Sequence, residues 1–394
     1  MTYALVSAGF LAVAVVAGIL LARRAGKPGL RWAAVGIAAA GLIVLTAVFD
    51  SVMIGSGLFS YAEHLISGIR IGLAPIEDFA YPLATVIALP ALWAVLTRAG
   101  AVPMGELLRQ AFIASRPVSW INTAFPFGAA MLLTTGQVDW LLVVGFLYYL
   151  VPYNLAMYGI NDVFDYESDI NNPRKGGIEG ALLPPRFHRP LLWLVLWSNV
   201  PFLIILIAAG SPAAWLAIAV STFAVIAYSA PRLRFKERPI LDSITSSTHF
   251  VSPAVVGLAL AHATIDLPVL LLLTAFFFWG MAAHAFGAVQ DVAPDREAGI
   301  GSIATVFGAR ATVRIAIGLW ALAGLLMLAT PWPGPLAAVV ALPYIVNAAP
   351  WWRVTDAESG ATNRAWRRFI WLNYGSGFVV TMILILHLTL SPGS

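Results

Sequence analysis

Two acidic segments contain the side chains of this chain that are best suited to chemistry. Their oxygen-bearing residues are Asn161, Asp162, Asp165 and Asp169 in the first segment and Asp291 and Asp295 in the second. Residues four positions apart share a helix face, so each segment can direct two or more oxygens towards one point. Mg²⁺ prefers oxygen ligands and is usually held by one or two carboxylates together with substrate phosphates. A lone acid could be a solvated loop charge, but two clusters with the same spacing predict a magnesium-bound diphosphate held between them.

A basic segment between the two acidic ones provides donors for a departing diphosphate. Residues 232–238 contain four cations, and they closely follow Tyr228 and Ser229. Cationic donors stabilise the charge that develops on a phosphate leaving group. The candidate contacts to the diphosphate are Tyr228, Ser229, Arg234, Lys236, Arg116 and Lys175. For Arg232 and Arg238, a simple positive loop at the membrane surface remains the alternative.

The composition places these charges in an integral membrane protein. The chain has 394 residues, of which 60% are hydrophobic and only 11% are charged. Its apolar runs are long enough to cross a hydrocarbon core of about 30 Å. The absence of cysteine excludes disulfides, thiolate metal sites and thiol nucleophiles. The net charge of +4 is scattered among apolar segments, so no nucleic-acid partner is expected.

The hydrophobic pattern predicts an all-α polytopic protein with about twelve transmembrane helices in a lipid bilayer. Three spans lie in residues 1–98, a linker with a surface helix at 104–114 occupies residues 99–118, and nine spans lie in residues 119–394. The expected spans are 3–22, 32–54, 78–97, 119–135, 140–160, 190–209, 213–230, 244–262, 267–289, 312–330, 335–352 and 369–389.

The distribution of positive charge predicts the orientation of these spans in the cell membrane. If the loops alternate between the two sides, every Lys and Arg except Arg70 falls on one side. The positive-inside rule assigns that side to the cytoplasm. Both termini are therefore expected outside, and both acidic segments are expected to face the cytoplasm.

An apolar chamber beside a bound diphosphate suits the formation of an allylic carbocation. Loss of the diphosphate creates the cation, the apolar interior excludes water, and aromatic faces stabilise the positive charge. Tyr158 lies on the same helical stripe as the first acidic segment and is a candidate for this role. A secondary transporter is a distant alternative, because transporters bind substrates near the bilayer midplane and these acids cluster at span ends.

Three runs resemble the UbiA superfamily of intramembrane prenyltransferases over about residues 105–394. They are Asn-Asp-x-x-Asp-x-x-x-Asp at 161–169, Tyr-Ser-x-Pro-x-x-x-x-Lys at 228–236 and Asp-x-x-x-Asp at 291–295. The resemblance implies a nine-helix bundle, two Mg²⁺–diphosphate sites at the acidic segments, and diphosphate contacts from Arg116, Arg234 and Lys236. Many members have another acidic residue where this chain has Gln290 and Ala293. Quinone precursors, haem and lipids remain alternative acceptors.

Two longer stretches, residues 115–128 and 284–296, resemble lycopene elongases. These enzymes join dimethylallyl units to the ends of a carotenoid, so the resemblance implies dimethylallyl diphosphate and lycopene or a related carotenoid as substrates. It also places Asn122 among the substrate contacts. His284 lies on the helix face of Asp291 and is a candidate to deprotonate the product cation. A helix-packing role for His284 remains equally open.

The first three spans contain carboxylates of their own, which are functional candidates inside a membrane. Asp50 ends the second span, and Glu77 and Asp78 follow Pro75. This Pro-x-Glu-Asp run, with the preceding Phe-Asp, resembles the small subunits of heterodimeric carotenoid cyclases over about residues 1–98. The resemblance implies ring closure with Glu77 and Asp50 as proton donor or cation stabiliser, and a separate second cyclase subunit as partner. For Asp78, favourable placement in the first turn of a helix is an equally good explanation.

Overall fold

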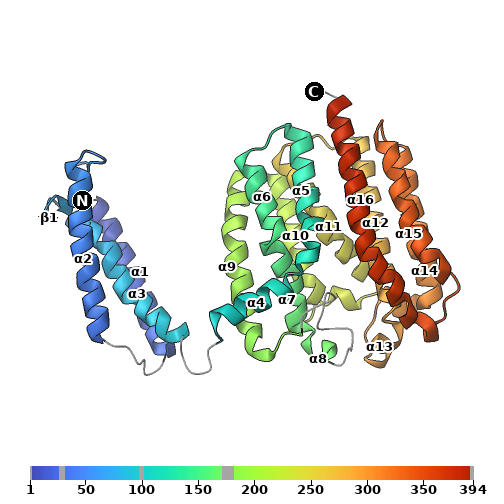
Figure 1. Ribbon diagram of the computed structural model, residues 1–394, viewed down its shortest axis with the longest axis horizontal. Helices are drawn as coiled ribbons and strands as arrows, with labels where there is room; N and C mark the ends of the chain where they lie inside the picture. Colours follow the sequence, from blue (N-terminus) through green and yellow to red (C-terminus); the bar gives the residue numbers. More distant parts are fainter. Residues whose placement is uncertain (1, 26–31, 97–101, 171–181, 391–394) are drawn as a thin grey trace. The chain divides into compact units, whose positions relative to one another are not determined.

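The computed structural model describes residues 2–25, 32–96, 102–170 and 182–390, shown as ribbon in Figure 1. The chain divides into two compact units, Met1–Glu106 and Leu107–Ser394.

The first unit is a three-helix assembly with a small polar cap. It consists of α1 (Thr2–Ala25), α2 (Trp32–Gly55), β1 (Arg70–Ile71), β2 (Ala74–Pro75), the 3-10 helix η1 (Ile76–Phe79) and α3 (Ala80–Leu96). The two short strands pair antiparallel with Arg70 opposite Pro75. Gly72 closes the hairpin with a φ of 67°, a conformation that glycine adopts without strain. The hairpin therefore leads the chain directly into η1, which contains Glu77 and Asp78.

The second unit is a helical bundle. Its elements are α4 (Met104–Ala114), which begins in the first unit, η2 (Pro117–Ser119), α5 (Trp120–Thr135), α6 (Trp140–Leu150), α7 (Pro152–Phe164), α8 (Tyr166–Asp169), α9 (Pro185–Ala209), α10 (Pro212–Ser229), η3 (Phe235–Glu237), α11 (Leu241–Leu260), α12 (Leu267–Val289), α13 (Val292–Glu297), α14 (Ile303–Leu328), η4 (Gly334–Val340), α15 (Ala341–Ala348), η5 (Ala349–Trp351), η6 (Asp356–Thr362) and α16 (Asn363–Leu390). The prediction of an all-α polytopic membrane protein is confirmed.

The described residues contain ten helical segments long and apolar enough to cross a membrane, whereas twelve were expected. The expected spans 119–135 and 244–262 are helices α5 and α11 but are not among the ten. Helix α5 has only 16 residues. Helix α11 has a run of serine, threonine and histidine in its first half, and much of this polar surface is buried inside the unit. Apolar content alone therefore underestimates the membrane-embedded part of this bundle.

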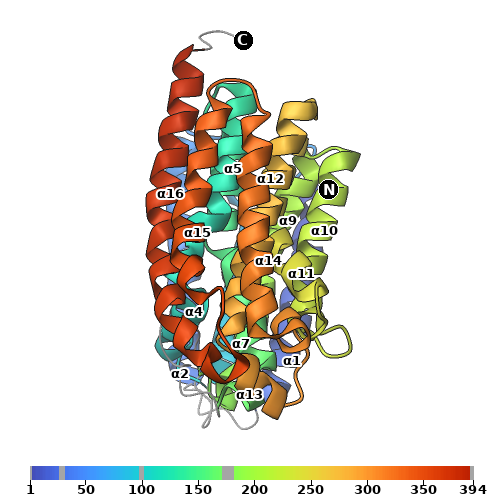
Figure 2. The ribbon, with the colours of Figure 1, turned by 90° about the vertical axis from the view of Figure 1, so that its right-hand side faces the viewer.

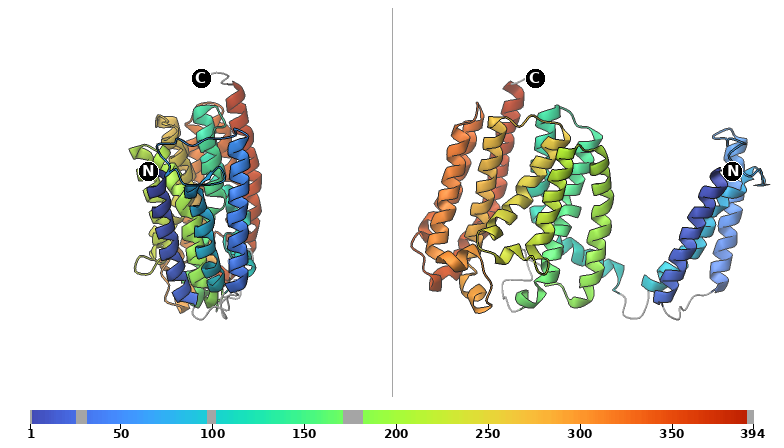
Figure 3. Two further views of the ribbon diagram at one scale, coloured as in Figure 1. Left: turned by 90° about the vertical axis from the view of Figure 1, so that its left-hand side faces the viewer. Right: turned by 180° about the vertical axis from the view of Figure 1, so that it is seen from behind.

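The bundle has two chemically different ends. The connections α5–α6, α9–α10 and α11–α12 lie together at one end (Figures 1 and 2). Asp139, Ser211 and Asp266 cap the following helices there by accepting backbone N–H groups. Helices α8 and α13 lie at the opposite end, as the view from behind in Figure 3 also shows. Both acidic segments are thus at the same end of the bundle.

A close approach between α5 and α6 depends on Gly145. A Cβ atom at this position would overlap the ring of Phe127, which is completely buried. The ring also packs against Tyr149, with 5.2 Å between centroids. Because ring and backbone have no room to separate, the contact requires glycine.

We expect Gly145→Ala to lower the free energy of unfolding by about 1–3 kcal/mol, the usual cost of overpacking a core. Thermal unfolding of the detergent-purified protein measures the change. Gly318→Ala in α14 is the matched control, because a Cβ atom there meets nothing within 4 Å. Alanine has a higher helix propensity than glycine, which favours this control substitution by about 1 kcal/mol. Equal effects of the two variants would contradict the packing argument.

Candidate functional site

The first acidic segment lies where α7 ends. Asp162 is in the last turn of α7, and Asp165 is the residue that separates α7 from α8. Only 1% of Asp162 and 4% of Asp165 is exposed. A buried carboxylate is costly unless opposite charge and hydrogen bonds compensate it, so the partners of these two acids define the site.

Asp162 is compensated by Arg116. The Nη2 atom of Arg116 lies 3.1 Å from Oδ1 of Asp162. The guanidinium carbon also lies 4.2 Å from the centre of the Tyr158 ring, in a cation–π arrangement. Arg116 precedes Pro117 and adopts a left-handed conformation with a φ of 50°, which is uncommon for residues other than glycine. The turn between α4 and η2 thus directs this cation at the first acidic segment.

Asp165 is compensated by the basic segment that follows α10. Lys236 forms a close ion pair with Asp165, and Nη2 of Arg234 lies 3.8 Å from the same oxygen. Arg234 also hydrogen-bonds Glu237. This bond raises the pKa of the Arg234 guanidinium and lowers the pKa of the Glu237 carboxyl. The basic segment therefore meets the first acidic segment as a network of fixed charges.

The end of α10 joins the same site. Asn161 donates a hydrogen bond from Nδ2 to the buried hydroxyl of Ser229 at 2.9 Å. The neighbouring ring of Tyr228 lies edge-on to His249 and His284, with centroid separations of 5.2 and 6.3 Å. Helices α7, α10, α11 and α12 therefore converge around Tyr228.

Asp242 is a site residue that the sequence analysis missed. It is completely buried near the start of α11, and Oδ2 lies 3.5 Å from Nε2 of His284. The two carboxylate oxygens accept the backbone N–H groups of Ser243 and Ile303 at 2.7 and 2.8 Å. An acid in the first turn of a helix is usually explained by its favourable interaction with the helix dipole. The position of Asp242 in the sequence therefore does not by itself indicate a role in the site. The available signal was its isolation, because it is the sole acid between Glu237 and Asp266.

The second acidic segment begins where α12 ends. Asp291 precedes α13 and Asp295 lies within it, and both are half-buried. The neighbouring Gln290 accepts a hydrogen bond from Asn363 at 2.6 Å and donates one to the carbonyl of Gly287 at 3.0 Å. In this chain, Gln290 therefore attaches α12 to α16.

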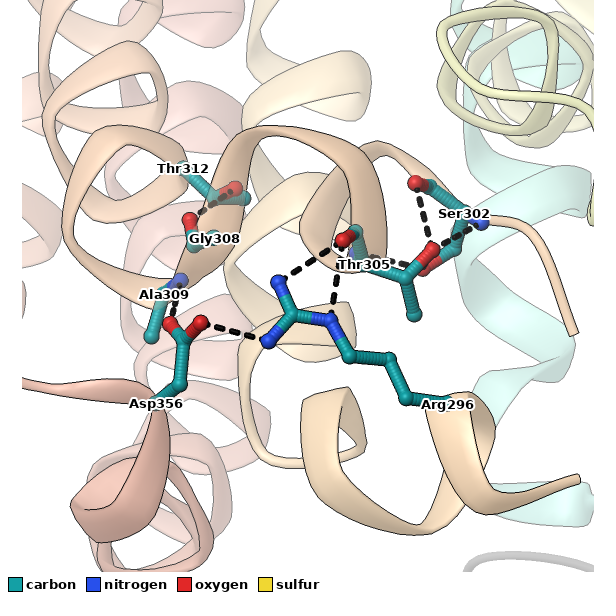
Figure 4. Close-up of polar contacts among 7 residues, drawn as sticks. All are labelled: Arg296, Ser302, Thr305, Gly308, Ala309, Thr312 and Asp356. Carbon is teal, nitrogen blue, oxygen red and sulfur yellow. Dashed lines mark hydrogen bonds and ion pairs between the residues drawn. The ribbon is translucent and has the colours of Figure 1, made fainter. Parts of the chain in front are cut away.

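The position of α13 is fixed by a polar network (Figure 4). Arg296 donates from Nε and Nη2 to the carbonyl of Thr305 at 3.0 and 2.8 Å, and from Nη1 to Asp356 at 2.6 Å. Asp356 also accepts the N–H of Ala309 at 2.7 Å. This N–H lacks a regular helical partner because Gly308, with a φ of 77°, interrupts α14. One carboxylate thus caps the second part of α14 and holds the helix that bears Asp295.

The donor set suits a magnesium site that substrate phosphates complete. Within the part of the chain that the structure describes, no three His, Asp or Glu side chains form a preassembled metal site. Mg²⁺ is often held by one or two carboxylates and substrate phosphates. Asp162 and Asp165, with the amide oxygen of Asn161, fit that pattern. The side chain of Asp169 and all of Lys175 lie outside the described residues, and Asn122 is half-buried on α5.

The first unit contains a separate group of acids. Glu77 is 6% exposed and accepts the N–H of Ser67 at 2.6 Å. Asp78 accepts the hydroxyl of Tyr61 at 2.8 Å, and the charge of Asp50 acts on the Asp78 carboxyl. Burial, together with the bond to Asp78, raises the pKa of the Tyr61 hydroxyl well above its usual value. Asp50 in the last two turns of α2 therefore belongs to the same electrostatic group as Glu77 and Asp78 of η1.

Comparison with known proteins places these features in a family. Residues 123–373 match the UbiA prenyltransferase family. The chain is 48% identical to the C(50) beta-cyclic carotenoids biosynthesis protein LbtBC of Dietzia sp. (strain CQ4), over 95% of this chain and 96% of that protein. It is 51% identical to a lycopene elongase/hydratase of Corynebacterium glutamicum, over 72% of this chain and 98% of the relative.

Solved structures give the same fold. A UbiA homolog from Archaeoglobus fulgidus, solved with DMAPP and Mg²⁺, matches with a TM-score of 0.50 and 20% identity. The match covers 68% of this chain and 98% of that one. The helical bundle of residues 107–394 therefore has the UbiA fold.

We expect Asp356→Ala to lower the free energy of unfolding by about 1 kcal/mol, because the N–H of Ala309 loses its acceptor. Asp356→Asn keeps an oxygen acceptor and loses only the charge that faces Arg296. Exposed ion pairs contribute about 0–1 kcal/mol, so its effect should be smaller. Chemical denaturation of the two variants beside the parent measures the difference. Equal losses in the two variants would show that the ion pair with Arg296, and not the cap on Ala309, fixes α13.

Proposed function

The chain belongs to the UbiA prenyltransferase family, and from this premise we propose that it transfers dimethylallyl groups from dimethylallyl diphosphate to the ends of lycopene. The product enters fifty-carbon carotenoid biosynthesis, in which the first unit contributes to cyclisation. The two relatives near 50% identity, both named for carotenoid chemistry, support a carotenoid acceptor over a quinone, haem or lipid.

The observation that carries this proposal is the pairing of buried acids with the cations that suit a diphosphate. Arg116 pairs with Asp162, and Lys236 pairs with Asp165. Magnesium diphosphate contains both kinds of charge. When it binds, the carboxylates can turn to the metal and the cations to the phosphate oxygens without leaving a buried charge uncompensated. The site is therefore suited to bind metal and diphosphate together.

Each charged group has a role in this reaction. We assign Mg²⁺ to the six acidic-segment residues Asn161, Asp162, Asp165, Asp169, Asp291 and Asp295, where the bound ion neutralises charge on the leaving group. Arg116, Arg234 and Lys236, joined by Lys175, bind the diphosphate. Tyr228 and Ser229 line the same end of α10. Tyr158 and Asn122 face the hydrocarbon substrates, and the apolar bundle keeps water from the allylic cation.

The orientation of the bundle in the membrane follows from the distribution of its positive charges. We assign the cytoplasmic side to the end that contains both acidic segments and place both termini outside, because nearly all Lys and Arg residues fall on that side. The location of α8 and α13 at one end of the bundle agrees with this assignment. Water-soluble dimethylallyl diphosphate then enters from the cytoplasm, while the carotenoid enters from the bilayer.

For residues 1–98 we assign a carotenoid cyclase role, with residues 99–118 as linker and 119–394 as the transferase. Two interacting carboxyls can hold one proton between them, and Asp50 acts electrostatically on Asp78. Glu77 is buried beside them and suits the stabilisation of a nearby cation. A second small cyclase subunit completes the site, because cyclases of this type combine two different three-span subunits.

We expect Asp165→Asn and Lys236→Met each to reduce prenyl transfer at least ~100-fold, since each removes a charge that acts on the leaving group. The assay uses purified protein in lipid with dimethylallyl diphosphate, Mg²⁺ and lycopene, and mass analysis of the pigments. Asp266→Asn is the control, because it keeps the helix cap at the other end of the bundle. Near-parental turnover in both site variants would exclude this diphosphate site.

We expect Glu77→Gln to abolish ring closure while prenyl transfer continues. The measurement is pigment analysis in a lycopene-producing bacterial host that also expresses a candidate second cyclase subunit. Acyclic elongated carotenoid should accumulate. Glu63→Gln is the matched control, because the side chain of Glu63 is exposed and forms an ion pair with Arg70 at the surface of the unit. Loss of elongation together with cyclisation in the Glu77 variant would contradict separate roles for the two units.

A further inference from the structure

Asp242 and His284 form a buried acid–imidazole pair that diphosphate binding does not explain. The carboxylate is completely buried and is held in place by the backbone of α11 and by Ile303, the first residue of α14. With its carboxylate fixed from two helices, Asp242 presents Oδ2 to His284 at 3.5 Å. The imidazole is 18% exposed, so it is the member of the pair that a substrate can reach.

The location of this pair is inward of the diphosphate site. His284 precedes Asp291 by seven residues, or roughly 10 Å along the axis of α12. Its ring faces Tyr228, whose neighbour Ser229 bonds Asn161 of the first acidic segment. A substrate whose diphosphate lies at the acidic segments extends its hydrocarbon towards this depth. The imidazole is therefore close to where carbon–carbon bond formation takes place.

The orientation of the imidazole selects one of its nitrogens. Nε2 faces the carboxylate, so the neutral ring carries its proton there and leaves Nδ1 as the basic atom. An acid in this position fixes the tautomer and stabilises the imidazolium that forms after proton uptake. His249 provides the contrast. It also packs on Tyr228, but in the described residues no carboxylate faces it.

We infer that His284 accepts the proton that is lost after prenyl transfer, and that Asp242 is its positioning residue. This inference rests on the proposed function. The C–O bond of dimethylallyl diphosphate breaks, and its electron pair leaves with the diphosphate. The π pair of the terminal double bond of the acceptor forms the new C–C bond and leaves a tertiary cation. An adjacent C–H bond then breaks, its electrons form a C=C bond, and the proton goes to Nδ1 of His284.

The competing fate of the same cation is capture by water, which gives a tertiary alcohol. The position of the proton acceptor therefore sets the ratio of alkene to alcohol in the product. It does not set the rate at which the diphosphate leaves, because ionisation precedes proton loss. This separation provides a readout that a purely structural role of His284 would not change.

The test compares His284→Gln with the parent in lipid, using dimethylallyl diphosphate, Mg²⁺ and lycopene. Glutamine retains hydrogen bonding but cannot accept a proton at neutral pH. We expect diphosphate release within about threefold of the parent and a fall of at least ~100-fold in the alkene-to-alcohol ratio, the lower end of general-base effects. His249→Gln is the matched control and should keep the parental ratio. Asp242→Asn should shift the ratio in the same direction as His284→Gln, but less.

Three outcomes overturn the inference: an unchanged ratio in His284→Gln, an equal shift in His249→Gln, or loss of diphosphate release together with the alkene in His284→Gln. In the third case His284 acts before the carbon–carbon bond forms. Failure of the proposed function has a different signature, because the parent protein itself would then release no lycopene-dependent diphosphate. Thermal unfolding of each variant identifies a change in folding.

Discussion

The whole arrangement depends on keeping carboxylates charged inside an apolar bundle. Asp162 and Asp165 are almost completely buried, and each lies against a cation from a distant part of the chain. Removing one partner of such a pair costs about 3–5 kcal/mol, because the other charge is left uncompensated. The ion pairs therefore tie α7 to the α4–η2 turn and to the segment after α10. Binding chemistry and folding use the same charges, so the site and the bundle are stable together.

The two cation-bearing turns show that this positioning has an energetic cost. Among the described residues, five other than glycine have positive φ, and three of them are Arg116, Arg232 and Arg234. Each such conformation costs on the order of 1 kcal/mol or more and persists only where surrounding contacts enforce it. For Arg116 and Arg234 the enforcing contacts include the pairs with Asp162 and Asp165. The other two, Ile240 and His262, flank α11, so part of this strain lies outside the turns that present charge.

The spacing of acids and cations in the sequence predicted which segments form the candidate site, because ligand chemistry requires particular residue types at particular intervals. It also predicted the helical bundle, since long apolar runs are local signals. It did not predict Asp242, whose role depends on α11, α12 and α14 meeting in space. The expected span 140–160 is interrupted between α6 and α7, because Pro152 has no N–H to continue the helix.

In the proposed chemistry, the transferase unit removes a proton from the carotenoid and the first unit supplies one. Prenyl transfer followed by proton loss to His284 leaves an alkene at the modified end of the carotenoid. Protonation of that alkene by an acid of the first unit restores a tertiary cation, which the neighbouring polyene can attack to close a ring, and loss of a second proton completes the reaction. Capture of the first cation by water would instead remove the double bond that cyclisation needs. A base that protects the alkene therefore gives a chemical reason for joining an elongating unit to an acid-dependent cyclising unit in one chain, whatever the distance between their sites.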